Sequence, residues 1–242
     1  MEDKQRLEEI REKIFNNYRP IDQTFDLVLS MKDILNVNFI QEACGHKFPS
    51  YYFLAVNDLE KCKKEDQEAL DKFLPNATAG GCEQLELSCV EKYYPEDILP
   101  GICNCIPNIT EEVHLDSFTI PLSFFSQIIL SSLALNTLKI MNCKIDATEE
   151  PSLSETPSTD PQLETIFLSG SLPGLLPSED EKIEEDHTEV SLKALHEIIK
   201  ILKHYSLHKC LQEVKVEETD LCETTVQSMF TEAGFSVEVE HW

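Results

Sequence analysis

An eleven-residue pattern in residues 135–145 constrains the fold of this chain more than any other feature of its sequence. Branched apolar residues fill positions one, four, six and eleven, namely Leu135, Leu138, Ile140 and Ile145. Positions four and six lie two residues apart, so their side chains turn to the same side of an extended strand. Cys143 stands at position nine, where we expect a small polar side chain to bind the backbone of the following turn. The pattern therefore predicts a short strand with one buried face.

The same frame recurs, with starts at residues 51, 82, 110, 135, 163 and 211. Its inward pairs at positions four and six are Leu54/Val56, Leu85/Leu87, Val113/Leu115, Leu138/Ile140, Ile166/Leu168 and Val214/Val216. Val237 and Val239 are predicted to be the inward pair of a last strand. Successive starts lie 31, 28, 25, 28 and 48 residues apart, and four of these spacings suit a strand followed by a helix. The chain is therefore predicted to be a stack of strand-helix units.

The segments between the strands have helical patterns. Residues 121–133 and 190–208 carry apolar side chains at helical spacing, and residues 63–74 and 95–105 hold the same place in earlier units. Thr188 is a predicted helix cap, and Gly234 is predicted to end a short helix that begins near Glu223. Strand and helix alternate, which predicts an α/β fold with a parallel sheet on the concave side of an arc and helices on the convex side.

These strand frames and helices resemble the leucine-rich repeat superfamily, and the long units are most similar to its ribonuclease-inhibitor-like class. There is also a distant resemblance to the sensing domains of nucleotide-binding leucine-rich repeat receptors. The resemblance covers residues 51–242 and implies a solenoid, although Asn is scarce at position nine. A solenoid end exposes apolar surface, so we expect residues 1–50 to form an N-terminal helical cap, with a separate adaptor domain as the alternative. Its predicted helices contain Leu7, Ile10 and Ile14, then Phe25, Val28 and Leu29, then Ile34 and Leu35.

Charge restricts the partners of the chain. There are 45 Asp and Glu residues against 20 Lys and Arg, a formal net charge of −25. Nucleic acids and anionic membranes are polyanions that bind through basic patches, so we expect neither as a partner and instead expect a protein with a basic surface. The sequence has no apolar run of membrane-spanning length and no secretory signal, and its nine Cys include no C-x-x-C pair. We therefore expect a cytoplasmic or nuclear protein with free thiols.

Two irregular stretches interrupt the frame, at residues 146–161 and 173–189. The second is strongly acidic, which favours a mobile loop. Ser178 precedes three acidic residues and Thr156 precedes Pro157, so each is a predicted phosphorylation site for an acid-directed or a proline-directed kinase. Tolerated drift of loop sequence is the simpler interpretation of both stretches.

No catalytic motif, cofactor-binding loop or metal-ligand set is recognisable, and we expect no catalytic, cofactor or metal site. His204 and His208 stand four apart, but two ligands do not make a structural zinc site. The leading hypothesis is a non-enzymatic protein-interaction module or scaffold that binds its partner through the concave sheet face. The side chain at position five points outward from that face. The predicted contact residues are those at position five together with Glu213 from a neighbouring position: Glu86, His114, Lys139, Phe167, Glu213, Lys215 and Glu238. Phe167 is the predicted anchor. The alternatives are an acidic chaperone or inhibitor-like protein that sequesters basic proteins by charge, and an enzyme on a repeat scaffold.

Overall fold

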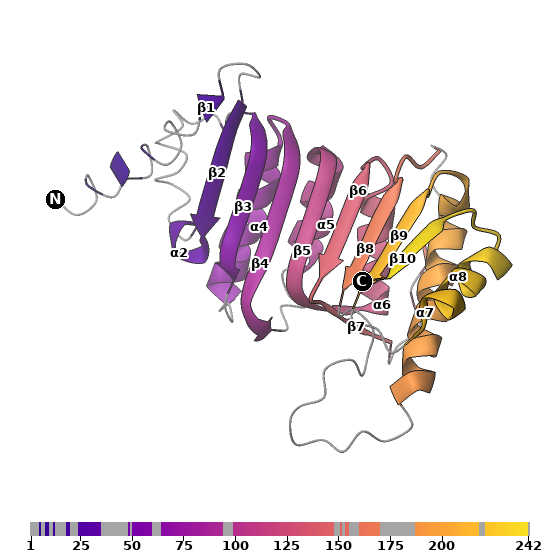
Figure 1. Cartoon of the computed structure of the whole chain (residues 1–242). Coiled ribbons are helices and arrows are strands. Elements are labelled where there is room, and N and C mark those ends of the chain that lie inside the picture. Colours follow the sequence, from indigo (N-terminus) through magenta and orange to yellow (C-terminus); the bar gives the residue numbers. More distant parts are fainter. Residues whose placement is uncertain are drawn as a thin grey trace. The chain divides into compact units, whose positions relative to one another are not determined.

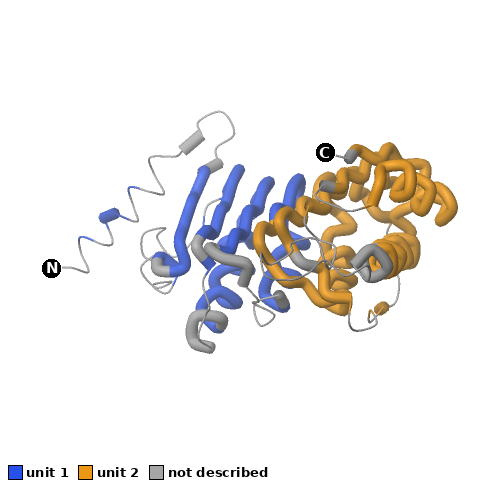
Figure 2. The backbone as a smooth tube through the Cα atoms, turned by 60° about the horizontal axis from the view of Figure 1, so that its bottom comes forward, with its two compact units in different colours: residues 1–114 blue, residues 115–242 orange. Residues whose placement is uncertain are grey.

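The computed structural model describes residues 5, 8–9, 12, 18–19, 24–34, 48, 50–59, 64–93, 99–147, 151, 153–154, 160–169, 187–217 and 221–241. They form an α/β fold in which parallel strands alternate with helices (Figure 1). The chain divides into two compact units, residues 1–114 and residues 115–242 (Figure 2). Within the described residues, no helix is both long enough and apolar enough to cross a bilayer.

Unit 1 is a sheet with helices on one face (Figure 1). In chain order, its elements are β1 (Tyr18–Arg19), β2 (Thr24–Ser30), α2 (Met31–Ile34), β3 (Tyr51–Leu59), α4 (Lys64–Thr78), β4 (Cys82–Tyr93), α5 (Leu99–Cys105), η2 (Ile106–Asn108) and the first part of β5 (Ile109–Pro121). β1 is antiparallel to β2, whereas β2, β3 and β4 pair in parallel. The register places Leu27 beside Leu54 and Leu54 beside Leu85, and these side chains are at most 1% exposed. The predicted inward pairs of the frames at 51 and 82 are therefore confirmed.

Residues 24–30 form a strand where the sequence analysis predicts a helix, so that prediction is wrong. Leu27 and Leu29 are buried, whereas Val28 between them is 45% exposed. This alternation is the period of a strand, and pairing with β3 covers the two leucines with the core of unit 1. Helical conformation does follow at α2, and residues 5, 8–9 and 12 are helical. The role of residues 1–50 as a cap or an adaptor remains a prediction.

Unit 2 repeats the same arrangement. After the second part of β5, its elements are α6 (Leu122–Ser131), β6 (Thr137–Met141), β7 (Lys144–Asp146), β8 (Thr165–Ser169), α7 (His187–His204), η3 (Leu207–Lys209), β9 (Glu213–Glu217), α8 (Glu223–Glu232) and β10 (Glu238–His241). β6, β8, β9 and β10 pair in parallel, and the helices lie on one side of them (Figure 1). Leu138, Ile166, Val214 and Val239 are consecutive register partners, and all four are buried. Position four of each frame therefore forms one apolar row.

A recurring hydrogen-bond pattern sets this register where the strands begin. The Asn136 carbonyl accepts the N–H groups of Glu164 and Thr165 at 3.0 and 3.1 Å. The Glu164 carbonyl accepts those of Gln212 and Glu213 at 2.8 and 3.1 Å, and the Gln212 carbonyl accepts that of Glu238 at 2.9 Å. Asn136, Glu164 and Gln212 all stand at position two of their frames. We call this row of accepting carbonyl groups the carbonyl ladder. The strand of each frame is therefore aligned by the frame before it.

The last strand is out of step with the predicted frame. Val237 and Val239 are both buried, as predicted, but Val239 is the register partner of Val214 and so stands at position four. Position five of β10 is consequently Glu240, the register partner of Lys215, and the assignment of Glu238 to that position is wrong. A shift of two residues cannot be read from apolar alternation alone, because it keeps every side chain on the same face and Val237 is buried as well.

Two residues with positive φ mark the ends of neighbouring frames. Ser117 (φ 66°) and Asn142 (φ 52°) both stand at position eight, and the backbone turns there. Beyond the turns, the end of β5 pairs with β7, with Ile120 beside Ile145. The buried Cys143 thiol accepts the Phe118 N–H at 3.3 Å and donates to the Leu115 carbonyl at 3.5 Å. The position-nine side chain therefore binds the backbone of the preceding frame, a contact that the sequence analysis does not predict.

The helix boundaries agree in part with the sequence analysis. α6 lies within the predicted helix, and Gly234 (φ 90°) follows α8 and donates its N–H to the Thr231 carbonyl at 3.0 Å, as a helix-ending glycine does. α7 begins at His187, so Thr188 lies inside the helix and is not its cap. α7 also ends at His204, before the predicted end at residue 208, because Ser206 adopts φ 63° and redirects the chain into η3.

Candidate functional site

In each unit the helices cover one face of the strands and leave the other uncovered (Figure 1). We call the uncovered side the open face. In unit 1 it is defined by Val28, Ala55, Glu86 and His114, and in unit 2 by Lys139, Phe167, Lys215 and Glu240. These side chains alternate along their strands with the inward apolar pairs, so they lie on the side away from the helices. Ala55 is small and only 2% exposed, whereas its register partner Val28 is 45% exposed. Both open faces are therefore rows of side chains held by paired backbone.

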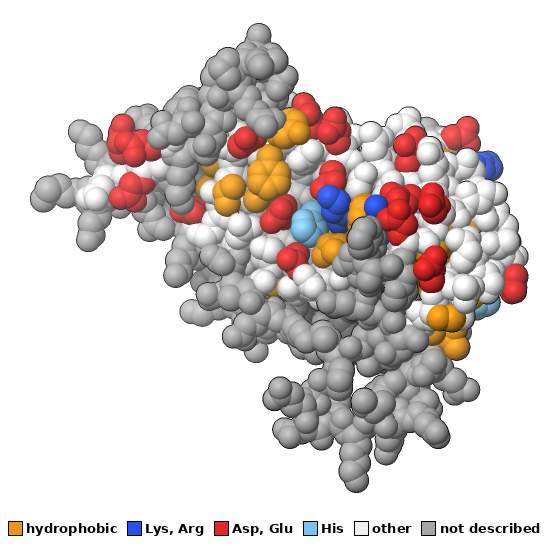
Figure 3. Space-filling model, in the orientation of Figure 1, with side chains coloured by type: hydrophobic (Ala, Val, Ile, Leu, Met, Phe, Trp, Pro, Cys, Tyr) orange, Lys and Arg blue, Asp and Glu red, His pale blue; other side chains and the backbone are white. Residues whose placement is uncertain are grey.

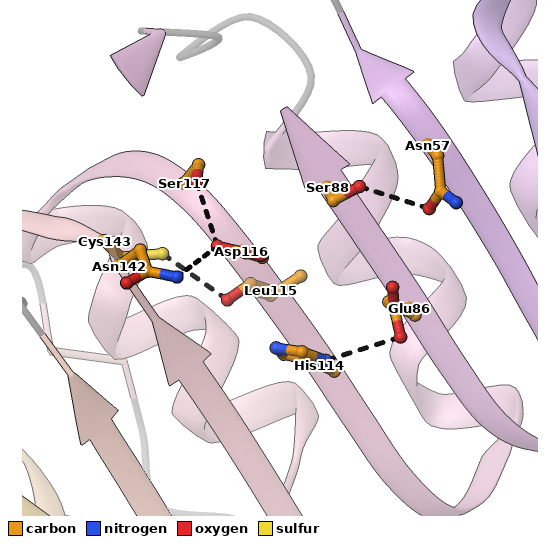
Figure 4. Close-up of polar contacts among 9 residues, drawn as sticks. All are labelled: Asn57, Glu86, Ser88, His114, Leu115, Asp116, Ser117, Asn142 and Cys143. Carbon is orange, nitrogen blue, oxygen red and sulfur yellow. Dashed lines mark hydrogen bonds and ion pairs between the residues drawn. The ribbon is translucent and has the colours of Figure 1, made fainter. Parts of the chain in front are cut away.

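The open face of unit 1 is part apolar and part ionic. Val28, Ala55 and Glu86 are consecutive register partners on β2, β3 and β4. His114 Nδ1 lies 3.5 Å from Glu86 Oε2 (Figure 4). His114 Nε2 is buried and has no hydrogen-bond partner among the described residues. In the neighbouring row, the Ser88 hydroxyl donates to Asn57 Oδ1 at 3.1 Å.

The open face of unit 2 is centred on an aromatic ring between two cations. Lys139 and Lys215 are the register partners of Phe167 on its two sides. Their ammonium nitrogens lie 5.4 and 5.1 Å from the centroid of the ring, within the range of cation–π attraction. Figure 3 shows lysine side chains with acidic side chains gathered beside them on this face. The position of the Phe167 ring is thus stabilised by two cation–π contacts as well as by the pairing of its strand.

Lys215 is also bound by two carboxylates. Its Nζ lies 3.0 Å from Glu240 Oε2 and 3.2 Å from Glu213 Oε1. The hydrogen bonds to Glu240 and Glu213 raise the pKa of the Lys215 ammonium above its usual value. All three side chains are 20–34% exposed, so the arrangement is accessible from solvent. A side chain tethered in this way loses less conformational entropy when a partner binds.

A further polar contact lies at the end of these strands in unit 2. The Asn142 amide and the Ser117 hydroxyl both donate to Asp116 Oδ1 at 2.9 Å (Figure 4). Asp116 and Asn142 therefore anchor the two positive-φ turns from outside, while Cys143 anchors them from the core.

The predicted contact residues divide between the two units. Glu86 and His114 meet in unit 1, whereas Lys139, Phe167, Lys215 and Glu213 meet in unit 2. Glu238 is the register partner of Glu213 and stands one row away from Lys215. The sequence analysis did not include Val28, Ala55 and Glu240 in the open faces. The alternation of residues 25–29 is the signal that identifies Val28, and the frame at 51 gives Ala55 directly. Ser178 and Thr156 lie outside the described residues.

Other polar features of unit 2 lie away from its open face. An open pocket of about 570 Å³ lies where the strands begin, lined among others by Asn136, Glu164, His208, Cys210 and Gln212. His208 Nδ1 is buried and has no hydrogen-bond partner among the described residues, and its ring packs edge-on against Phe235. His204 instead hydrogen-bonds the Ser154 carbonyl at 2.8 Å through Nε2. No three His, Cys, Asp or Glu side chains in the described part of the chain are grouped to hold a metal ion.

The thiols differ in their chemistry. Burial raises the pKa of Cys82 to about 12. Cys222 is exposed at the start of α8, and hydrogen bonds from the hydroxyls of Thr224 and Thr225 lower its pKa to about 7. Cys222 therefore forms a thiolate near neutral pH, whereas Cys82 stays a thiol.

The chain matches no protein-family model, no curated protein and no solved structure. The function of the open faces is therefore inferred from their own geometry.

Proposed function

We propose that this chain is a non-enzymatic interaction module that binds a partner protein through its open faces. The observation that carries the proposal is the arrangement of Phe167 between Lys139 and Lys215, with Lys215 bound to Glu213 and Glu240. Aromatic side chains, Phe among them, are enriched at protein interfaces, and a few buried anchors contribute most of the binding energy there. Here they stand on neighbouring strands with their positions set by register, which is how a preorganised binding surface is built.

We further propose that the strand-helix units are leucine-rich repeats of the ribonuclease-inhibitor-like kind. Three observations support this: the apolar row at position four, the carbonyl ladder at position two and the positive φ of Ser117 and Asn142 at position eight. Each recurs at one place in successive frames, as expected when every unit of a solenoid contacts only its neighbours.

A protein with a basic surface is the partner that the charge supports. The chain carries a formal net charge of −25, which repels nucleic acid and anionic lipid but attracts a basic protein in the cytoplasm or nucleus. Charge alone would also support the sequestration of any basic protein. The two functions differ in their response to salt, because a packed interface persists at physiological ionic strength whereas attraction between exposed charges is strongly screened.

The experiment is capture of binding proteins from cell extract at 0.15 M salt by the full chain, compared with two double variants. Phe167→Ala with Glu213→Lys alters the open face of unit 2. Leu153→Ala with Glu232→Lys makes a matched change in size and charge at two exposed residues outside that face. We expect the first variant to lose a partner that the second retains. Equal capture by both variants would contradict the proposal, and thermal unfolding monitored by circular dichroism verifies that both are folded.

A further inference from the structure

Two carboxylates stand side by side on the open face of unit 2. Glu213 on β9 and Glu238 on β10 are register partners, one row below Lys215 and Glu240. Neighbouring strands are about 4.8 Å apart, so the two side chains start from backbone positions at that spacing. The flanking residues Val214 and Val239 are buried, so Glu213 and Glu238 project from the open face. Like charges directly opposite each other destabilise a sheet.

The chain itself balances this pair only in part. Lys215 contacts Glu213 through Oε1 and divides its charge between Glu213 and Glu240. Exposed Glu238 takes part in no ion pair with another described residue. The Lys215 ammonium therefore contacts Glu213 and Glu240 but not Glu238, whose exposed carboxylate is accessible to a partner.

The geometry points to an arginine of the partner as the group that completes this arrangement. Resting on the function proposed above, we propose that the open face of unit 2 binds an extended basic segment whose arginine guanidinium lies between Glu213 and Glu238. A guanidinium presents five N–H donors in one plane and can bond two carboxylates at once. An ammonium is a compact point charge and matches two separated acceptors less well.

The neighbouring row explains why the segment is extended. Phe167 and Lys215 stand two residues along their strands from Thr165 and Glu213, on the same face. In an extended segment lying along β9, side chains two residues apart point the same way and have the spacing of these rows. An apolar side chain two positions from the arginine would therefore pack on the half-buried ring of Phe167. The proposed ligand therefore has an arginine and an apolar residue two positions apart, both facing the sheet.

The experiment is fluorescence anisotropy with the full chain at 0.15 M salt. The probe is a fluorescein-labelled peptide, Arg-Thr-Val-Thr-Arg-Thr-Val, in which arginine and valine stand two residues apart and so share one face of an extended segment. It is compared with peptides that carry lysine or uncharged citrulline in place of arginine. The test variant is Glu213→Gln with Glu238→Gln. The control is Glu223→Gln with Glu232→Gln, which removes the same charge from two exposed residues of α8.

We expect the test variant to bind the arginine peptide about tenfold more weakly, because both hydrogen bonds to the guanidinium lose the charge of their acceptor. The control should stay within twofold of wild type, and the lysine and citrulline peptides should bind more weakly than the arginine peptide. Equal weakening in the test and control variants, equal affinity for all three peptides, or no binding of the arginine peptide would each overturn the inference. Because the capture experiment with Phe167→Ala uses natural partners, it can still succeed if the arginine site fails, so the two failures are distinguishable.

Discussion

Replacing the buried thiol of Cys143 tests whether position nine holds the turns of unit 2 together. The Cys143 thiol bonds the Phe118 N–H and the Leu115 carbonyl and is fully buried. Cys143→Ala removes a sulfur-sized apolar group, which costs about 1 kcal/mol of transfer free energy. It also leaves the buried Phe118 N–H without its thiol partner, which costs about 1–3 kcal/mol. The expected loss in the free energy of unfolding is therefore about 2–4 kcal/mol.

A second substitution separates packing from hydrogen bonding at this position. Cys143→Val restores apolar volume but accepts no hydrogen bond, so it should remain about 1–3 kcal/mol less stable than wild type. Urea unfolding monitored by circular dichroism measures both changes, with Cys222→Ala as the exposed control, expected within about 0.5 kcal/mol of wild type. The reasoning fails if Cys143→Val is as stable as wild type, because packing alone would then account for the role of the thiol.

Two further predictions follow from backbone strain and from thiol chemistry. Ser117 has φ 66°, so Ser117→Gly should stabilise the protein by about 0.5–1 kcal/mol and Ser117→Val should destabilise it by about 1–2 kcal/mol in urea unfolding; the opposite order would contradict the strain. The pKa of Cys222 is about 7 and that of Cys82 about 12, and the thiolate forms as pH rises through the pKa. Iodoacetamide labelling followed by mass spectrometry should therefore rise at Cys222 with a midpoint near pH 7 and leave Cys82 unlabelled below pH 9, whereas a Cys222 midpoint near that of an ordinary thiol would refute the lowering.

Apolar alternation was sufficient to predict most strands, because burial on one face imposes a period of two on the sequence. It failed at residues 24–30, where Phe25, Val28 and Leu29 also fit a helix and only pairing with β3 decides between the two. It placed Glu238 in the row that Glu240 occupies, because a shift of two residues keeps the same side chains on the buried face.

The candidate site was predicted less completely than the fold. Position five correctly placed Lys139, Phe167 and Lys215 in one row. The contact of Cys143 with the preceding frame was not predicted, because a thiol can bond any nearby backbone and the sequence does not show which backbone lies near it. The bridging of Lys215 between Glu213 and Glu240 depends on side-chain positions across two strands, which no single-strand pattern contains.

The carbonyl ladder at position two affects which insertions and deletions this chain can tolerate during evolution. Thr165 and Glu213 are register partners although 48 residues separate them, while Thr137 and Thr165 are partners across 28. Alignment is set at the entry to each strand by hydrogen bonds to the strand before it, so the length of the connector does not enter. Connectors can therefore gain or lose residues without moving the side chains of the open face. Such a chain can acquire regulatory sequences between its strands while its recognition surface keeps the same alignment.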